Sequence, residues 1–378
     1  MSTVYFFLFA AVGAMTPYLS LYYKSAGLSA TEISILLSMV PALLFISQPV
    51  FGPLTDRSGH RGRMLSYLFL LIAGTGLLMS LGTSFWMILP AVVLWAIFSG
   101  PTVPIADSIA LGEVVRTGIA YPRLRLWGSI GFVLTTTVAG RLYDTIDLRW
   151  AFAFYAALNI VAWFFARRLP AEGISGQRDV WPVLKQLLRN PILIGFLLLS
   201  ALCQTTQAAH ASFFSIHMQS LGGSKGMVGL AWGIAAITEV PVWLVLSKVT
   251  KRTGPLVLLA FSSLMYALRW YLFATVSDPG ALLWLQLLQS VSFAIFMPTA
   301  VVLIGDLIPA DLRTSGQALL VLVNGGVATI LGNVAAGYLV DLVGTTLLYR
   351  VAAYVALAAG LGFVLLFRHS RRPAADPA

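Results

Sequence analysis

The sequence predicts an all-α polytopic membrane protein in which twelve transmembrane helices form two six-helix pseudo-repeats. Three observations lead to this fold class: the composition, the length of the apolar runs and an internal repeat. Hydrophobic residues make up 58% of the 378 residues, and charged residues make up only 10%. A soluble domain normally carries about 25% charged residues. The chain therefore has little sequence left for a soluble domain.

The apolar residues gather in runs of about 20 residues, the length that spans the hydrocarbon core of a bilayer. Backbone polar groups in lipid must be hydrogen-bonded internally, so each run is expected to be a helix. The first run is longer than a signal-peptide core and has no basic segment before it, so we expect a retained first helix. The expected helices cover roughly residues 3–23, 32–51, 64–83, 86–107, 121–143, 149–168, 191–217, 226–247, 255–276, 281–305, 315–340 and 346–367.

One extended polar stretch separates the sixth run from the seventh. It contains Pro, Gly and charges of both signs, which is typical of a linker. We therefore expect four parts: an N-terminal six-helix half (1–168), a cytoplasmic linker (169–190), a C-terminal six-helix half (191–367) and a cytoplasmic tail (368–378).

The two halves share an internal repeat. Residues 113–144 align without gaps to residues 310–341, an offset of 197 residues. Arg116 then meets Arg313, and the pattern A-G-x-L-x-D recurs at Ala139 and Ala336. Tandem six-helix halves are typical of transporters that hold a solute near the membrane midplane and expose it alternately to the two sides.

The formal net charge of +10 reports membrane topology rather than a nucleic-acid partner. With the N-terminus in the cytoplasm, 18 Lys and Arg residues fall on the inner side and 5 on the outer side, while Arg269 lies within a helix. This bias predicts a multi-pass protein of the cell (inner) membrane with both termini in the cytoplasm. The single Cys203 excludes a disulfide framework, and no hydrolase or nucleotide-binding motif is present, so we expect no enzyme and no cofactor.

The stretch "GPLTDRSGHRGR" (52–63) concentrates charges between two apolar runs. Gly52, Asp56, Arg57, Gly59 and Arg61 fit the G-x-L-x-D-R-x-G-R/H-R pattern between helices 2 and 3 of the major facilitator superfamily, which the whole chain resembles. The glycines permit a tight turn and a close helix approach, and Asp56 can latch the halves on the cytoplasmic side. The alternative is a basic loop that only sets topology.

A narrower resemblance covers helices 4 and 5. The segment "IADSIALGEVV…YPRLRLWGSIGF" resembles the proton-coupled lactose, nucleoside and phenylpropionate permeases, and helices 7 and 8 resemble the phenylpropionate branch most. The resemblance implies that Asp107 and Arg125 line the solute site with Trp127 beside them. Asp107 and Arg125 flank a turn centred near Arg116, so we expect them at equal depth, where they can pair or share a ligand.

Glu239 and Arg269 repeat this geometry, because each lies fifteen residues from Gly254 and so near mid-membrane. A proton carrier needs a carboxylate whose proton affinity changes as an arginine approaches, so we expect Glu239 to carry the proton and Arg269 to tune it. Lactose permease, which this chain resembles, also has Glu on helix 8 and Arg on helix 9. Helix 10 of this chain offers Gln286 and Gln289 instead of that permease's His and Glu. The alternative is that these charges are static helix pins.

Further solute contacts are expected from polar and aromatic residues on other helices. His210 and Gln207 share one face of helix 7. Tyr18 and Tyr22 share a face of helix 1 and can form an aromatic wall, while the alternative for Tyr22 and Tyr23, near the outer end, is an interfacial aromatic belt. The complete expected solute-binding set is Asp107, Arg125, Trp127, Tyr18, Gln207, His210 and Gln289.

The predicted function is proton-coupled symport, in the uptake direction, of a small organic solute such as an aromatic acid, a sugar or a nucleoside. The expected partners are this solute, protons and the lipid bilayer, and the resemblance implies a monomer. Three alternatives stay open: a proton-coupled exporter, a passive facilitator and a non-transporting membrane receptor. The exporter is disfavoured because residues 128–140 lack the G-P-x-x-G-G part of the antiporter motif.

Overall fold

The computed structural model describes residues 1–169, 190–309 and 312–370, apart from the side chains of five residues, Asp56 among them. Within these ranges every regular element is a helix and no strand occurs, which confirms the all-α fold class. Nine helical segments of the described chain are long and apolar enough to cross a membrane. One of them, Ser315–Ser370, divides at Gly344, and α7 and α8 complete twelve crossings of the described chain.

The N-terminal half contains the first six crossings. Their bounds are α1 (Ser2–Met15) with η1 (Thr16–Tyr18) and α2 (Leu19–Ser25), α3 (Ala30–Ser58), α4 (Arg61–Met79), α5 (Phe85–Ser99) with α6 (Thr102–Thr117), α7 (Tyr121–Tyr143) and α8 (Trp150–Ala166). The C-terminal half consists of α10 (Pro191–Ser220), α11 (Lys225–Thr253), α12 (Pro255–Thr275), α13 (Pro279–Leu285) with η2 (Gln286–Gln289) and α14 (Phe293–Leu307), and α15 (Arg313–Val321) with η4 (Leu322–Ala328) and α16 (Thr329–Ser370).

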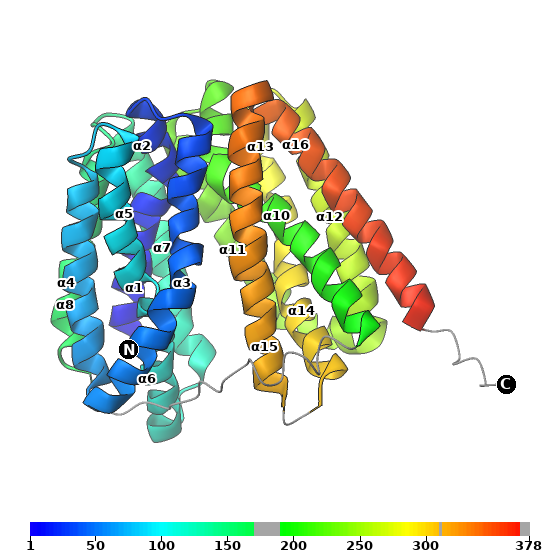
Figure 1. Ribbon diagram of the computed structural model, residues 1–378, viewed down its shortest axis with the longest axis horizontal. Coiled ribbons are helices and arrows are strands. Elements are labelled where there is room, and N and C mark those ends of the chain that lie inside the picture. Colours follow the sequence, from blue (N-terminus) through cyan, green and yellow to red (C-terminus); the bar gives the residue numbers. More distant parts are fainter. Residues whose placement is uncertain (170–189, 310–311, 371–378) are drawn as a thin grey trace.

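The two halves stand side by side as separate bundles, α1 to α8 on the left and α10 to α16 on the right (Figure 1). They meet where α7 packs on α11 and α3 packs on α16. The fourth and tenth crossings are each interrupted. In the fourth, α5 ends before Gly100 and Pro101, and in the tenth, α13 gives way to a 3-10 turn at Gln286. Interrupted helices of this kind bring irregular backbone to the middle of a transporter.

Helices α3, α6 and α11 extend well beyond their predicted ends, and α11 reaches Thr253 rather than ending near residue 247. Helix α3 continues to Ser58 rather than ending near residue 51, so most of the 52–63 motif is helical. Helix α6 continues to Thr117 rather than ending near residue 107, and Gly118 then ends it in the left-handed conformation with φ 74°. These extensions contain polar residues that follow the apolar run, so the length of the apolar run does not predict them.

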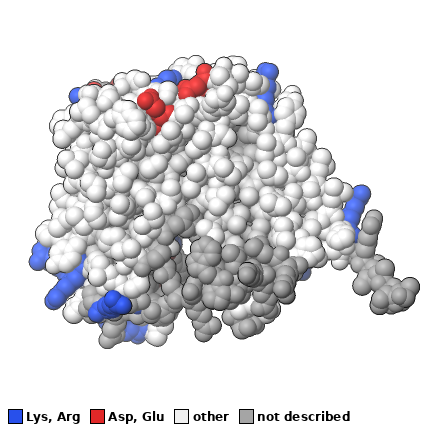
Figure 2. Space-filling view, viewed as in Figure 1, with Lys and Arg blue, Asp and Glu red and all other residues white. Residues whose placement is uncertain are grey.

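On the face seen in Figure 2, the described charged residues lie toward the ends of the molecule. Figure 2 shows a broad band without Lys, Arg, Asp or Glu across the middle of the visible face. Large apolar side chains are exposed on this protein, among them Leu134, Leu244 and Tyr354, as lipid contact requires. We call the end that carries Arg57, Arg116 and Lys251 the basic end, and the other end the opposite end.

Candidate solute and proton site

Asp107 lies in the N-terminal half, six residues after the break in helix 4. Its Oδ1 accepts hydrogen bonds from the Tyr5 hydroxyl at 2.6 Å and from the Tyr121 hydroxyl at 3.0 Å. Tyr5 is fully buried, whereas Asp107 is half-buried. Among the described residues no partner is seen for Oδ2 of Asp107. Two tyrosines therefore hold this carboxylate and leave one of its oxygens available.

Arg125 on α7 is also half-buried, and its guanidinium lies against aromatic faces. Its Cζ lies 3.9 Å from the centre of the Phe9 ring and 5.6 Å from the centre of the Tyr5 ring. No hydrogen bond or ion pair links Arg125 to any other described residue. A guanidinium has five N–H donors, so Arg125 is a cation with donors to spare, held in place by rings from α1.

The equal depth predicted for Asp107 and Arg125 is wrong. Because helix 4 runs on to Thr117, Asp107 lies ten residues before the end of α6, while Arg125 lies only four residues into α7. The six-residue difference corresponds to about 9 Å along the helix axes. The two groups do not form an ion pair in the described structure, and the Tyr5 side chain lies between them, bonded to one and contacting the other.

Two residues that the sequence predicts for the solute site in the N-terminal half lie outside this cluster. Trp127 is 47% exposed and shares a stripe of α7 with the exposed Leu134 and Val138, and no contact joins it to Asp107 or Arg125 in the described structure. Tyr18 is 1% exposed, and its hydroxyl donates to the backbone oxygen of Thr136 at 2.6 Å. Tyr18 therefore joins helix 1 to α7 and shows no open face to a ligand.

The second cluster, in the C-terminal half, is centred on Arg269 of α12, which is fully buried. Its Nη2 donates to Oε1 of Gln286 at 2.6 Å, and its Nη1 donates to Oε1 of Gln289. Nη2 also lies 3.3 Å from Nε2 of His210. The Arg269 guanidinium stacks on Trp270 as well, with Cζ 4.7 Å from a ring centre. The break in helix 10 places both glutamines on this one cation.

Glu239 and Arg269 do not contact each other directly. Gln289 lies between them: its Nε2 donates to Oε1 of Glu239 at 3.1 Å, and its Oε1 accepts from Arg269. The turn predicted at Gly254 is present, with φ 83°, so the equal-depth prediction for this pair rests on the correct turn. Instead of a direct ion pair, the Gln289 amide connects the Glu239 carboxylate to the Arg269 guanidinium through two hydrogen bonds.

His210 lies in an aromatic cage next to Arg269. Its ring centre is 4.7 Å from that of Trp270, 5.0 Å from Phe214 and 5.9 Å from Trp232. Its Nδ1 lies 2.9 Å from the Tyr349 hydroxyl. A continuous chain of polar contacts thus runs from Glu239 through Gln289, Arg269 and His210 to Tyr349.

Several buried polar atoms around this chain have no partner. Among the described residues they include Gln207 Oε1, Gln286 Nε2, Trp232 Nε1 and Arg269 Nε. Buried polar groups are normally hydrogen-bonded, so unpaired ones call for a ligand or water. Gln207, expected from the sequence to bind solute, therefore has a free acceptor beside the His210 cage.

The aromatic residues that hold Asp107, Arg125 and His210 in place were not predicted from the sequence. Tyr5 and Phe9 belong to the aromatic run "VYFFLF", which resembles lipid-facing sequence. A tyrosine hydroxyl deep in an apolar helix is nevertheless a signal, since a buried hydroxyl needs a partner. Tyr349 carries the same signal, and Tyr121 stands just before Pro122 at a helix start.

The 52–63 motif, with its predicted residues Gly52, Asp56, Arg57, Gly59 and Arg61, is described in part. Gly59 adopts φ 64° between α3 and α4 and so makes the predicted turn, but Gly52 lies inside α3. Arg57 is exposed, and Arg61 is 7% exposed and donates to Oγ of Ser108 at 3.0 Å. The side chain of Asp56 lies outside the described part of the structure.

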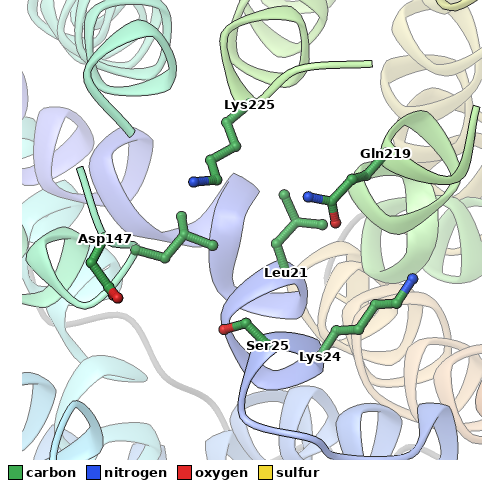
Figure 3. Close-up of a pocket in the computed structure, with 7 residues that line it drawn as sticks. Leu21, Lys24, Ser25, Asp147, Gln219 and Lys225 are labelled. Carbon is green, nitrogen blue, oxygen red and sulfur yellow. The ribbon is translucent and has the colours of Figure 1, made fainter. Parts of the chain in front are cut away.

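A separate pocket of about 430 Å³ opens at the opposite end, on the seam between the halves. Figure 3 shows Lys24, Ser25 and Asp147 facing it from one half and Gln219 and Lys225 from the other. It contains none of the predicted site residues. Within the described ranges, no three His, Cys, Asp or Glu side chains come together to hold a metal ion.

Known proteins resemble this chain over most of its length. The profile of the MFS_1 like family matches residues 1–351. The maltose permease of Geobacillus stearothermophilus is 30% identical over 348 residues, which cover 89% of this chain and 86% of the permease. A protein of Escherichia coli (strain K12) named as a probable 3-phenylpropionic acid transporter is 25% identical over 302 residues, or 77% of this chain and 78% of that protein.

The fold also has a solved counterpart. The crystal structure of the nucleoside transporter NupG superposes with a TM-score of 0.86 at 18% identity, covering 97% of this chain and 98% of NupG. The chain belongs to the MFS_1 like family. It is a multi-pass membrane transporter of small solutes, and not an enzyme.

Proposed function

We propose that this transporter takes up a small polyhydroxylated organic solute, such as a sugar or a nucleoside, together with a proton. The observation that carries the proposal is the contrast between the two clusters. The N-terminal half presents an unpaired guanidinium and an available carboxylate oxygen, at Arg125 and Asp107. The C-terminal half links a carboxylate to a buried guanidinium through Gln289.

The solute class follows from the chemistry of the first cluster. A hydroxyl group both donates and accepts hydrogen bonds, so a polyol can satisfy Asp107 Oδ2 and the Arg125 N–H groups at once. The rings of Tyr5 and Phe9 beside them suit the apolar face of a sugar or a base. An aromatic acid suits Arg125 but meets repulsion from an ionised Asp107. The name of the maltose permease, which is 30% identical to this chain, supports the hydroxylated class.

Glu239 is assigned as the proton carrier and Arg269 as its partner. An ionised Glu239 attracts the Gln289 N–H, which turns the amide oxygen toward Arg269. Protonation removes the charge that orients this amide. The change then reaches Arg269, His210 and the unpaired polar atoms around them, where the solute's second contact is expected. Proton and solute binding are coupled through this rearrangement.

The orientation is assigned from charge. The positive-inside rule places the basic end in the cytoplasm and the protein in the cell (inner) membrane, with both termini cytoplasmic. We retain the division into halves at 1–168 and 191–367 with a linker at 169–190, a tail at 368–378 and a monomeric state. Asp56, within the motif at the basic end, is proposed to latch that end when the opposite end opens.

Proton movement in proteoliposomes tests the proposal. The purified protein is reconstituted, and maltose, uridine or 3-phenylpropionate is added outside in unbuffered medium with a pH electrode. We expect one hydroxylated solute to carry protons into the vesicles. Solute flux without proton movement identifies a facilitator, protons moving against the solute identify an exporter, and binding without flux identifies a receptor. A response to 3-phenylpropionate alone contradicts the assigned solute class.

A matched pair of variants separates the proton role from general damage. Glu239→Gln keeps the size of the side chain and removes its charge, so we expect solute exchange to continue while proton movement stops. Glu32→Gln is the control, because this carboxylate contacts only Ser29 of its own turn. Proton movement that survives in Glu239→Gln contradicts the assignment of the carrier.

A further inference from the structure

Two aspartates at the opposite end bond to the first turns of helices in the other half. Asp341, on α16, accepts hydrogen bonds from the backbone N–H of Ala30 at 2.7 Å and of Thr31 at 2.8 Å. The Thr31 hydroxyl adds a third bond at 2.6 Å. Ala30 and Thr31 begin α3, so a carboxylate of the C-terminal half caps a helix of the N-terminal half.

Asp144 makes the reciprocal contact. It follows the last residue of α7, and its Oδ1 accepts from the backbone N–H of Lys225 at 2.7 Å. Its Oδ2 accepts from the N–H of Gly226 at 3.0 Å. Lys225 begins α11, so here a carboxylate of the N-terminal half caps a helix of the C-terminal half. The Lys225 ammonium also donates to the backbone oxygen of Tyr143 at 2.6 Å.

The internal repeat relates these two contacts. Asp144 and Asp341 are the last residues of the two A-G-x-L-x-D copies, 197 residues apart. Their partners at the starts of α3 and α11 are 195 residues apart, and the same offset relates "DRSGH" (56–60) to "KRTGP" (251–255). Each copy thus closes the seam in the same way, from opposite sides of a pseudo-two-fold axis.

The glycine of each copy makes this approach possible. A Cβ on Gly140 would lie 2.6 Å from the backbone oxygen of Lys225, and one on Gly337 would lie 2.6 Å from the backbone oxygen of Ala30. Real Cβ atoms do not approach backbone oxygens that closely. The glycine therefore brings the two helices together, and the aspartate one turn later caps the helix it meets.

Capping across the seam has a consequence that ordinary capping lacks. The first N–H groups of a helix have no partner within it, and a carboxylate there also interacts favourably with the helix dipole. These bonds break when the halves separate at the opposite end. All hydrogen bonds seen between described residues of the two halves lie at that end. Besides the bonds of Asp341, Asp144 and Lys225, they include one from the Ser215 hydroxyl to the Pro17 backbone oxygen at 2.6 Å.

We propose that Asp144 and Asp341 are positioning residues of the transport cycle, a duplicated latch that holds the opposite end closed. Opening that end breaks both caps, so the two aspartates set the balance between the two states of the transporter. The proposal goes beyond the function proposed above. It concerns the seam rather than the solute site, and its readout needs neither solute nor proton.

Spin-label distances across the opposite end test the latch. Labels are attached at Arg149→Cys and Ser277→Cys, both exposed, in a Cys203→Ser background, and the distance distribution is measured by double electron–electron resonance. Loss of a helix cap shifts an equilibrium about five-fold. We therefore expect Asp144→Ala and Asp341→Ala each to raise the ratio of open to closed molecules about five-fold, and the double variant about 25-fold, since distant sites add.

Two controls separate the latch from a general loss of caps. Asp278→Ala removes a carboxylate that caps α13 within its own half, through the Ala281 N–H at 2.7 Å, and the distribution should stay unchanged. Asp144→Asn keeps an acceptor that caps helices well, so it should retain most of the closed population. A double alanine variant with the parent's distance distribution overturns the proposal, as does an Asp278→Ala shift of equal size. If the double variant does not fold, the two single variants decide in the same way.

Discussion

Arg125 and Arg269 are both arginines within the membrane-spanning helices, and their surroundings differ in kind. Arg269 is fully buried and bonded to two glutamines, with His210 and Trp270 against it. Arg125 is half-buried and lies against the rings of α1, with no hydrogen bond or ion pair to another described residue. A guanidinium whose bonds are already made is a fixed part of the protein, whereas one held by ring faces keeps its donors for a ligand.

The carboxylates differ in the same way. Asp107 is held by two tyrosine hydroxyls through a single oxygen. Glu239 is bonded to Gln289, which is itself bonded to Arg269, so its charge is connected to a network. On this comparison we propose that the first cluster recognises the ligand and the second couples the proton. Each experiment below tests whether the two clusters have these separate roles.

The largest effect is expected from Arg269→Ala, on stability. Removing this cation leaves buried oxygens of Gln286 and Gln289 without a donor, and each such loss costs about 1–3 kcal/mol. We expect the variant to lose about 3 kcal/mol or more in denaturant unfolding from detergent micelles, while Arg125→Ala loses about 1 kcal/mol. Equal losses for the two arginines would remove the distinction between a fixed and an available guanidinium.

The next effect is expected from Arg125→Ala, on solute affinity. Hydrogen bonds to a charged group contribute about 1.5–3 kcal/mol, so the dissociation constant of the solute should rise about 100-fold while the fold persists. Arg123→Ala is the matched control, because Arg123 lies two residues earlier on α7 with an exposed side chain. Isothermal titration with the solute identified by proton flux measures both variants, and unchanged affinity in Arg125→Ala removes this residue from the site.

The smallest effect is expected from Tyr5→Phe. The variant loses the hydroxyl bonded to Asp107 at 2.6 Å but keeps the ring under Arg125, and Tyr121 still holds the carboxylate. One hydrogen bond contributes about 1 kcal/mol, so affinity should fall about five-fold. Tyr18→Phe should not change affinity, because that hydroxyl bonds to the Thr136 backbone oxygen. A larger loss in Tyr18→Phe than in Tyr5→Phe would return Tyr18 to the solute site.

Much of the fold could be predicted from composition and the repeat, because run length and charge bias depend on the bilayer rather than on side-chain packing. The depth of Asp107 could not, since it depends on a helix end set by Gly118 and not by the end of an apolar run. Trp127 lies on another face of α7 than Arg125, because two residues along a helix correspond to a rotation of about 200°.

The partners of the buried charges were also out of reach. The sequence places Glu239 and Arg269 at one depth, but the bridge between them comes from Gln289, on a third helix whose 3-10 turn turns its amide inward. The repeated aspartates at 144 and 341 were visible as a pattern. Their bonds to helix starts in the opposite half required the assembled seam.

The pH dependence of solute binding tests the central division most directly. The dissociation constant is measured from mildly acidic to mildly alkaline buffer for the parent protein and for Glu239→Gln. If a protonated Glu239 favours bound solute, the parent should lose affinity as the pH rises and Glu239 ionises, while the glutamine variant should bind with pH-independent affinity close to the parent's acidic value. The same pH dependence in both proteins, or loss of binding in Glu239→Gln at every pH, would contradict it.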